Sequence, residues 1–390
     1  MITLKDDQIQ DVFNKRAVRK DGINDILRIT LDAIMYAERE AFLKRENSEN
    51  NKANGYRPIK VNGYGRQLAL AVPRDRTGTF KPVLMLALKE QAEEKHQLCF
   101  KLYREGLTTR RISKILADIY QERYAQSTIS GMTQTFKEQL EAWRSRPLQS
   151  RYLVVYLDAI HSKVRRGNSV QGEAFYAALA VKEDYTRETI YLSNNPTEST
   201  AGWDNVLKDL KKRGVEAIDL VVADGIVGLE EKVLANFPTA SFQKCVTHLK
   251  RNILNSVRPG DKQKIAADLK SLFDISDNRY NRKKAHQKAE EIIMIWQKKY
   301  PALKKELNKE NLRPFFTCLD FDYRIRRMIY TTNAIERLHK EFRRALKIRN
   351  AMPSVDSVLL LLSAISCEME ETTYKHPIYN FSYEPKFQRK

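Results

Sequence analysis

The chain has 390 residues, enough for two or three domains, and its hydrophobic content of 42% is typical of a globular protein. Lysine and arginine number 69 against 49 acidic residues, and the net charge of +20 predicts a large anionic partner, usually nucleic acid and less often an acidic membrane surface. No apolar run reaches the roughly 20 residues that span a bilayer. The start of the chain lacks a secretory pattern and the four cysteines form no paired framework, so we expect a cytoplasmic protein without a membrane partner.

Residues 1–82 predict a helical and hairpin region at the N-terminus. One apolar face at helical spacing predicts an amphipathic helix within residues 1–48, and it comprises Ile23, Leu27, Leu31 and Ile34. Asn-Gly pairs at 54–55 and 62–63 are turn signals, and the alternating stretch 67–72 favours a strand. We therefore expect a small β-hairpin, followed by a basic loop at 73–80.

Residues 83–148 return to helical periodicity and contain a candidate DNA-reading motif. A short helix within 106–120, a polar break and a second helix opening at Ser127 are typical of a helix-turn-helix. This motif would place hydroxyl side chains at base edges and basic side chains near phosphates. The hydroxyl residues are Thr128, Ser130 and Thr133, and the basic residues are Arg110, Arg111 and Lys114. A plain helical hairpin fits the same pattern.

After a polar linker at 149–151 the pattern becomes α/β. We expect strands at 152–157, 175–181, 188–193, 218–223 and 241–244, and helices at 203–213 and 229–236. Asp158 follows the first of these strands and Asp224 the fourth. The carboxyl ends of strands form the ligand-binding edge of an α/β sheet. Either aspartate could equally cap a helix.

Residues from about 250 to 326 form a lysine-rich helical block that interrupts the α/β unit before its last helix. Its expected core stripe comprises Ile292, Ile293, Ile295 and Trp296. A further apolar helix is expected at 358–365, and the aromatic and basic tail from residue 374 is expected to be loosely ordered.

The last helix of the α/β unit, predicted over 330–347, carries a carboxylate at the head of a basic stripe. Thr331, Thr332 and Asn333 offer N-cap oxygens at its start. The predicted buried face comprises Ile335, Leu338, Phe342, Ala345 and Leu346. Glu336 heads the neighbouring stripe, and the basic residues expected to hold phosphates are Lys340, Arg343, Arg344 and Lys347. An ordinary solvated helix face has the same spacing.

Asp158, Asp224 and Glu336 come from two strand ends and this later helix. Crowded carboxylates repel one another, and a hard divalent cation removes that cost. Two such ions about 4 Å apart activate a hydroxyl and stabilise a leaving oxygen in phosphodiester cleavage or transfer. We expect these three residues to be catalytic and to bind two Mg²⁺ or Mn²⁺ ions, with Asp158 bridging both. Competing third carboxylates are Asp320, Asp322 and Glu341.

Cys245 and His248 have the C-x-x-H spacing of half a zinc site. A structural zinc ion needs four ligands, and no second Cys/His pair stands nearby, which argues against a zinc finger. We expect this segment, with Arg251, to contact phosphate or to position the active site. A histidine satisfied within the core is the alternative.

Six stretches of the chain, in order, resemble the Mutator-type transposases of bacterial insertion sequences. These stretches are 72–82, 106–113, 156–161, 222–229, 243–252 and 330–337. The resemblance implies a ribonuclease-H-like catalytic core interrupted by an all-helical insertion. It also implies an aspartate-aspartate-glutamate triad at Asp158, Asp224 and Glu336, and it places the family's C-x-x-H signature at Cys245 and His248, with Arg251 and Asn333 beside these motifs.

The resemblance also implies a function on double-stranded DNA. The chain would bind the terminal inverted repeats of its own element, cut them and join them to target DNA, as a homodimer or larger assembly on the bacterial nucleoid. The expected domains are 1–82, the helix-turn-helix domain 83–148, the first part of the core 149–250, the helical insertion 251–327, and the last helices with the tail 328–390. A nuclease of the same fold that does not join strands, and a non-catalytic DNA-binding protein derived from a transposase, are the alternatives.

Overall fold

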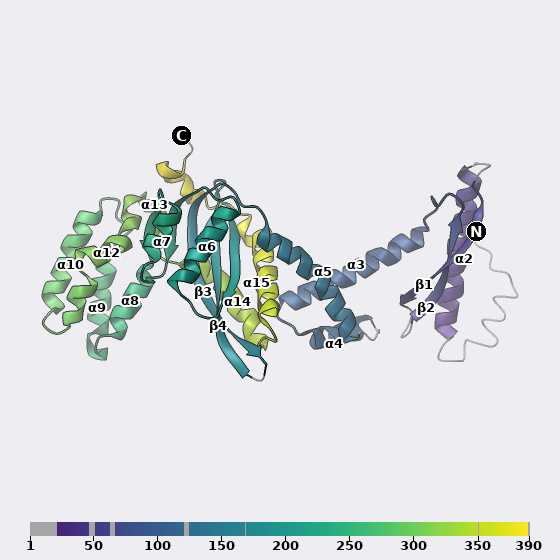
Figure 1. Cartoon of the computed structure of the whole chain (residues 1–390), viewed down its shortest axis with the longest axis horizontal. Coiled ribbons are helices and arrows are strands. Elements are labelled where there is room, and N and C mark those ends of the chain that lie inside the picture. Colours follow the sequence, from purple (N-terminus) through teal and green to yellow (C-terminus); the bar gives the residue numbers. More distant parts are fainter. Residues whose placement is uncertain are drawn as a thin grey trace. The chain divides into compact units, whose positions relative to one another are not determined.

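The computed structural model describes residues 22–46, 51–62, 67–120, 125–167, 169–349 and 351–388. The chain divides into two compact units, Met1–Phe136 and Lys137–Lys390. Figure 1 shows their helices and strands along the chain. The predicted mixture of helices and strands is confirmed.

The first unit combines a long helix with a β-hairpin and a helical segment. Its elements are α2 (Gly22–Glu46), β1 (Ala53–Asn62), β2 (Gln67–Asp75), α3 (Val83–Arg104), α4 (Thr109–Tyr120) and the first part of α5 (Gln126–Ser145). Strands β1 and β2 pair antiparallel, which confirms the predicted hairpin. Helix α2 packs on β2, where a carboxylate oxygen of Asp32 accepts a hydrogen bond from the backbone N–H of Ala71 at 2.9 Å.

The predicted amphipathic helix is confirmed as α2, and its apolar face is only partly covered, since Leu31 and Ile34 are partly buried and Ile23 and Leu27 are exposed. One turn prediction for this first unit was wrong. The Asn-Gly pair at 54–55 is no hairpin turn, since it lies inside β1 at an irregularity of the register, where Gly55 has a φ of 68°. The second Asn-Gly pair, at 62–63, begins at the last residue of β1, and residues 63–66 lie outside the described residues, as do residues 1–21.

The second unit is built on a five-stranded mixed sheet. Its strands and the helices between them are β3 (Arg151–Arg166), β4 (Ser169–Val181), β5 (Arg187–Asn195), α6 (Thr200–Lys212), β6 (Ala217–Ala223), α7 (Leu229–Asn236) and β7 (Ser241–Lys244). The strand order is β5-β4-β3-β6-β7. Strands β3, β4 and β5 are antiparallel neighbours, whereas β6 and β7 run parallel to β3. The predicted order of strands and helices in this region is confirmed.

Strand β3 is much longer than the sequence pattern predicted. It continues to Arg166, so Asp158 lies within the strand and not after its end. The parallel ladder between β3 and β6 nevertheless stops at the pair Leu157–Ala223. Asp158 and Asp224 are the next residues on the two strands, and they therefore lie at the same edge of that ladder.

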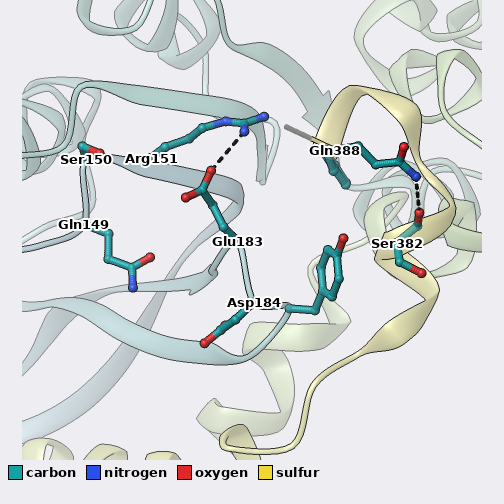
Figure 2. A pocket seen from close by; sticks show the side chains of 9 residues that line it. Gln149, Ser150, Arg151, Glu183, Asp184, Ser382 and Gln388 are labelled. Atoms are coloured by element: carbon teal, nitrogen blue, oxygen red, sulfur yellow. Dashed lines mark hydrogen bonds and ion pairs between the residues drawn. The ribbon is translucent and has the colours of Figure 1, made fainter. Parts of the chain in front are cut away.

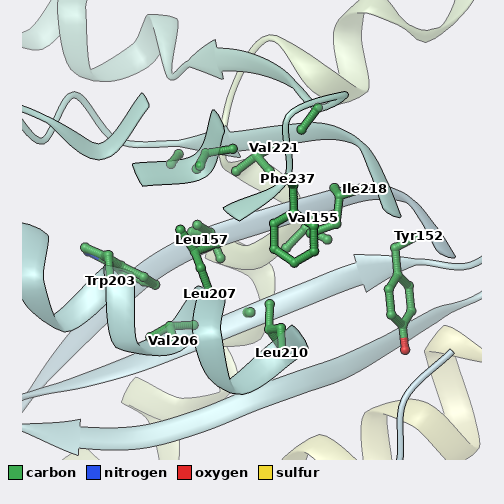
Figure 3. Packing of buried hydrophobic residues seen from close by; sticks show 14 of the residues in the cluster. Tyr152, Val155, Leu157, Trp203, Val206, Leu207, Leu210, Ile218, Val221 and Phe237 are labelled. Atoms are coloured by element: carbon green, nitrogen blue, oxygen red, sulfur yellow. The ribbon is translucent and has the colours of Figure 1, made fainter. Parts of the chain in front are cut away.

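One face of the sheet is covered by α6 and α7, and Figure 3 shows the resulting core. Apolar side chains of β3, β4 and β6 meet the inner faces of both helices, where Trp203, Leu207 and Phe237 are buried. The rings of Trp203 and Tyr176 pack edge to face with their centroids 4.4 Å apart. This packing fixes the start of α6 against the sheet.

The opposite face of the sheet is covered by α14 (Asn333–Arg349) and α15 (Val355–Met369), which pack against β3 and β5, respectively. The predicted buried face of α14 is confirmed, and its apolar members are Ile335, Leu338, Phe342, Ala345 and Leu346. His339 is buried with them. This helix is therefore held against the strand that carries Asp158.

Between β7 and α14 the chain forms a helical block. It consists of α8 (Val246–Asn255), α9 (Pro259–Leu272), α10 (Arg282–Trp296), α11 (Pro301–Glu306), α12 (Lys309–Leu312), η1 (Arg313–Phe315), η2 (Thr317–Asp320) and α13 (Tyr323–Ile329). The side-chain amide of Gln243 ties it to the sheet by donating to the carbonyl of Phe315 at 3.0 Å. Of the predicted core stripe, Ile292 and Trp296 are buried, but Ile295 is exposed because α10 buries only one row of side chains.

The C-terminal tail is ordered, and the prediction of a loose tail was wrong. After α15 the chain forms η3 (Glu370–Tyr374), η4 (Tyr379–Tyr383) and η5 (Pro385–Phe387). Phe381 and Phe387 are buried, and the ring of Phe387 packs on that of Phe321 with centroids 5.8 Å apart. Aromatic burial thus fastens the tail to the helical block.

A substitution of Gly202, at the start of α6, tests the packing of α6 on the sheet. A Cβ on Gly202 would lie 2.5 Å from the hydroxyl oxygen of Tyr176 and 2.8 Å from the side-chain nitrogen of Asn195. We expect Gly202→Ala to lower the free energy of unfolding by about 1–3 kcal/mol through overpacking. Urea unfolding measures this loss. Gly260→Ala, where no atom lies within 4 Å of the new Cβ, is the control and should lose no stability.

Candidate active site

The edge of the parallel ladder brings Asp158 and Asp224 to one place. The two residues follow the paired Leu157 and Ala223, and neighbouring strands lie about 4.8 Å apart. A third carboxyl group lies near both. Burial, and then the charges of Asp158 and Asp224, raise the pKa of Glu198, which also accepts a hydrogen bond from the indole N–H of Trp203 at 3.2 Å. Negative charge is therefore concentrated at this edge.

A chain of hydrogen bonds connects Asp224 to the start of α14. The backbone N–H of Cys245 donates to the carbonyl of Ala223 at 2.9 Å, beside Asp224. The Cys245 sulfur accepts from the hydroxyl of Thr332 at 3.3 Å and from its N–H at 3.4 Å. Glu336 lies in the first turn of α14, and its N–H donates to the carbonyl of Thr332 at 3.0 Å. The helix carrying Glu336 is thus attached to the strand end that carries Asp224.

His339 provides a second connection, from α14 to Asp158. Its side chain is fully buried, and its Nδ1 lies 3.1 Å from a carboxylate oxygen of Asp158. Residues three apart in a helix share one face, so Glu336 lies on the side of α14 that faces Asp158. Asp158 and Asp224 thus lie at the same edge of the β3–β6 ladder, and Glu336 lies one turn from the contact between His339 and Asp158. Sequence reasoning missed His339, although its spacing from Glu336 was a usable signal.

His248 contacts Asp224 directly through Nδ1. Hydrogen bonds to Asp224 and then to Cys245 raise the pKa of His248 to about 10, against the effect of burial. Burial opposes ionisation of Cys245, but hydrogen bonds from His248 and Thr332 hold the pKa of its thiol below the usual value. This contact favours the positioning role for His248 among the roles that the sequence left open.

Asp224, Cys245 and His248 also place ligand atoms within 4.8 Å of one another, a spacing that one metal ion could span. Asp224 and His248 are in direct contact, and the sulfur of Cys245 accepts from Thr332, so these three residues form one polar cluster beside the sheet edge. In the described part of the chain, no second Cys/His pair joins them.

The competing carboxylates are occupied elsewhere. Asp320 accepts from the guanidinium of Arg282 at 2.7 Å, and Asp322 caps α13 while pairing with Arg324 at 2.8 Å. Glu341 pairs with Arg344 at 3.0 Å, so Arg344 is not wholly available for phosphate. The other predicted phosphate-binding residues of α14 are exposed, namely Lys340, Arg343 and Lys347, as are Arg251 and Asn333.

The predicted helix-turn-helix falls on α4 and α5 of the chain. Arg110, Arg111, Lys114 and Thr128 are exposed there, as DNA contacts require. The side chains of Ser130 and Thr133, and the turn at 121–124, lie outside what the structure describes. The helices occur where they were expected, and their contacts with DNA stay a prediction.

A cavity of about 890 Å³ lies at the other end of β3 from Asp158, and Figure 2 shows its lining. Arg151 is its most prominent charged group and pairs with Asp219 at 2.6 Å and with Glu183 at 3.1 Å. None of the predicted site residues lines it. The cavity therefore adds nothing to the carboxylate site.

Known proteins to which this chain is similar belong to one class. Residues 2–376 match the model of the Mutator family of transposases. A probable transposase for an ISRM3-like insertion sequence element of Sinorhizobium fredii is 34% identical over 351 residues, which cover 88% of this chain and 86% of that protein. The transposase for insertion sequence element IS905 of Lactococcus lactis is 31% identical over 87% of this chain and 88% of its own length.

The transposase for element IS256 in transposon Tn4001 of Staphylococcus aureus is 26% identical over 95% of each chain. Transposases are enzymes that cut and join DNA. The chain belongs to the Mutator family of transposases. Within the ranges that the structure describes, no helix is both long and apolar enough to cross a membrane.

The raised pKa of His248 makes stability depend on pH. The folded protein binds this proton more tightly than the unfolded chain, whose histidine titrates near 6.5, so the stabilisation is complete below pH 6.5 and is lost as pH rises through about 10. We expect the difference in Tm between wild type and His248→Gln, without divalent ions, to be largest near pH 6 and to shrink toward pH 10. Thermal scans across this range measure it.

His286 supplies the control for this titration. Burial, and then Lys309 and Arg282, lower its pKa below the ordinary value, so both the folded and the unfolded chain carry a neutral His286 well above pH 7. His286→Gln should therefore show a constant difference in Tm from wild type between pH 8 and 10. A constant difference for His248→Gln as well would contradict the bond to Asp224.

Proposed function

We propose that this chain is a transposase that binds the terminal inverted repeats of its own insertion sequence and catalyses metal-dependent DNA cleavage and strand transfer at Asp158, Asp224 and Glu336. The observation that supports this most is the double attachment of α14 to the sheet edge, through His339 to Asp158 and through Cys245 beside Asp224. The relatives are transposases for insertion sequence elements, which supports the choice of substrate.

We propose a ribonuclease-H-like core made of residues 149–250 and 328–390, with the helical block 251–327 inserted. Three antiparallel strands followed by parallel β6 and β7, with α14 packed on β3, agree with this arrangement. The division of the chain into units at Phe136 falls inside α5, ahead of the boundary proposed at residue 148. The proposed DNA-reading domain 83–148 thus contributes the end of α5 to the second unit.

The donor set at the sheet edge suits divalent magnesium or manganese. Asp158, Asp224 and Glu336 offer carboxylate oxygens, are only partly buried, and lie where the charges of both aspartates already raise the pKa of Glu198. When bound, two such ions about 4 Å apart activate an attacking hydroxyl and stabilise the leaving oxygen. Asp158, Asp224 and Glu336 would hold them.

The surrounding side chains orient these ligands. His339 places a ring nitrogen beside Asp158, and His248 does the same beside Asp224, so each aspartate is fixed by a histidine. Beyond Glu336, α14 presents an exposed row of basic side chains, which would bind the phosphates on either side of the cut. That row comprises Lys340, Arg343 and Lys347, and Arg251 lies exposed on α8.

Recognition of the element's ends is assigned to the exposed residues of α4 and α5. Arg110, Arg111 and Lys114 would contact phosphates, and Thr128 would contact base edges. Two ends must be held together before they are joined to a target, and we therefore propose a homodimer or larger assembly on DNA.

Isosteric loss of each carboxylate charge tests the active site. Asp158→Asn, Asp224→Asn and Glu336→Gln keep the size of each side chain but remove a metal-binding charge. We expect each to reduce Mg²⁺-dependent nicking and strand transfer to background, while DNA binding stays at the wild-type level. The measurement uses a labelled duplex carrying the ends of the element that encodes the chain.

The rejected carboxylates provide matched controls. Asp320→Asn and Glu341→Gln remove a charge of the same kind, paired with arginine elsewhere, and should retain cleavage. Full activity in any of the three site variants would disprove the site assignment. Binding without Mg²⁺-dependent cleavage in wild type and variants alike would instead indicate a non-catalytic DNA-binding protein.

Substitution of Cys245 tests the attachment of α14 to the end of β6. Cys245→Ala removes the acceptor for both bonds from Thr332, and we expect the cleavage rate at limiting Mg²⁺ to fall about 10–100-fold, as for residues that orient metal ligands. Cys318 is equally buried but lies in the helical block. Cys318→Ala should lose similar stability and keep the wild-type rate, so equal rates in both variants would refute the linkage.

A further inference from the structure

Strands β3 and β4 extend past the rest of the sheet as a two-stranded arm, defined here as residues 161–167 and 169–173. Strand β6 pairs with β3 only as far as Leu157, and β5 pairs with β4 only beyond the arm, from Ala174 onward. Figure 1 shows the two strands projecting beyond their neighbours. The arm starts on the same strand as Asp158, three residues further along.

The arm has one supported face and one open face. A two-stranded hairpin is only marginally stable alone in water. Its support is Met352, whose backbone N–H donates to the carbonyl of Lys163 and whose carbonyl accepts from the N–H of Arg165, both at 2.9 Å. Val164 and Met352 are buried together on this supported face. The arm is therefore fixed in place by the segment that follows α14.

The charges of the arm are divided between these two faces. On the supported side Glu173 is buried and pairs with Arg166 at 2.7 Å. The open face presents His161, Lys163 and Arg165 from β3, all of them exposed. Their cross-strand partners include Gly172 opposite Lys163 and Val170 opposite Arg165, and Val170 is 49% exposed.

The open face is therefore positively charged, and its charges are unpaired. Among the described residues, Lys163 and Arg165 form no ion pair, and the one carboxylate of the described arm, Glu173, lies on the opposite face. Glycine opposite Lys163 removes any side chain that could shield it. A flat, unshielded cationic strip suits a polyanion that approaches closely.

We propose that the open face of this arm binds the phosphate backbone of a DNA duplex, through Lys163 and Arg165. This inference rests on the proposed function. It adds a DNA-contacting surface that belongs to neither the α4–α5 helices nor α14. Backbone contacts of this kind set the register of a duplex and carry no base sequence.

The strand geometry gives the face on which these contacts lie. Side chains alternate between the two faces of a strand, so Lys163 and Arg165, five and seven residues beyond Asp158, lie on the opposite face of β3 from its carboxylate. The arm would therefore contact DNA on a different face of the strand from the one that carries Asp158.

Salt dependence of binding tests the contact without requiring cleavage. In full-length Asp224→Asn protein, without divalent ions, the affinity for a duplex carrying the element's end is measured from low to moderate salt. The added double substitution Lys163→Ala/Arg165→Ala should reduce the slope of log K against log salt by about 1.8, or 0.9 for each lost phosphate contact. Lys163→Arg/Arg165→Lys keeps both charges and should restore the slope.

Lys211→Ala/Lys212→Ala is the matched control, because it removes two exposed charges at the end of α6 and should leave the slope unchanged. An unchanged slope in the arm variant overturns the proposal, whatever the cleavage assays show. Absence of Mg²⁺-dependent cleavage by the wild-type chain, together with a reduced slope in the arm variant, would leave the arm as a DNA contact and overturn only the catalytic assignment.

Discussion

The second unit depends on one set of bonds around Cys245. Its N–H donates to the carbonyl of Ala223 at the end of β6, and its sulfur accepts two hydrogen bonds from Thr332 at the start of α14. Without the bonds to sulfur, α14 would be held to the sheet by apolar packing, by His339 beside Asp158 and by the bond from Val246 to Tyr330. Directional bonds fix the axial position of the helix. A carboxylate in its first turn is then held in register with the strand ends.

Much of this fold could be predicted because each strand carries its own pattern. The buried runs of β3, β4 and β6 are apolar, and α14 has a clear apolar stripe, so local sequence and final burial agree. The extension of β3 was missed because its alternation, with Ile160 and Val164 buried between polar residues, follows an apolar run and an aspartate. The ordered tail was missed because its aromatic residues have no periodicity, and their burial depends on contacts with distant residues such as that of Phe387 with Phe321.

The carboxylates were predictable for a similar reason, and their partners were not. An aspartate at a strand end is visible in the sequence, and two parallel neighbours bring such residues together. That His248 faces Asp224 follows from the start of α8 directly after β7. That His339 faces Asp158 follows from the packing of α14 on β3. Contacts between elements distant in sequence depend on geometry that a single-residue pattern does not contain.

The helical block leaves and re-enters the core at one point, because the N–H of Val246 donates to the carbonyl of Tyr330 at 3.1 Å. The conformational entropy lost on closing a loop grows only with the logarithm of its length, by about 0.6 kcal/mol for each doubling. Once its two ends are bonded together, the helices of the block that contact neither the sheet nor the tail can lengthen or shrink without moving the residues on either side. The contacts of Phe315 and Phe321 fix the rest of the block, so the outer helices form a module whose length can change while the carboxylates keep their places.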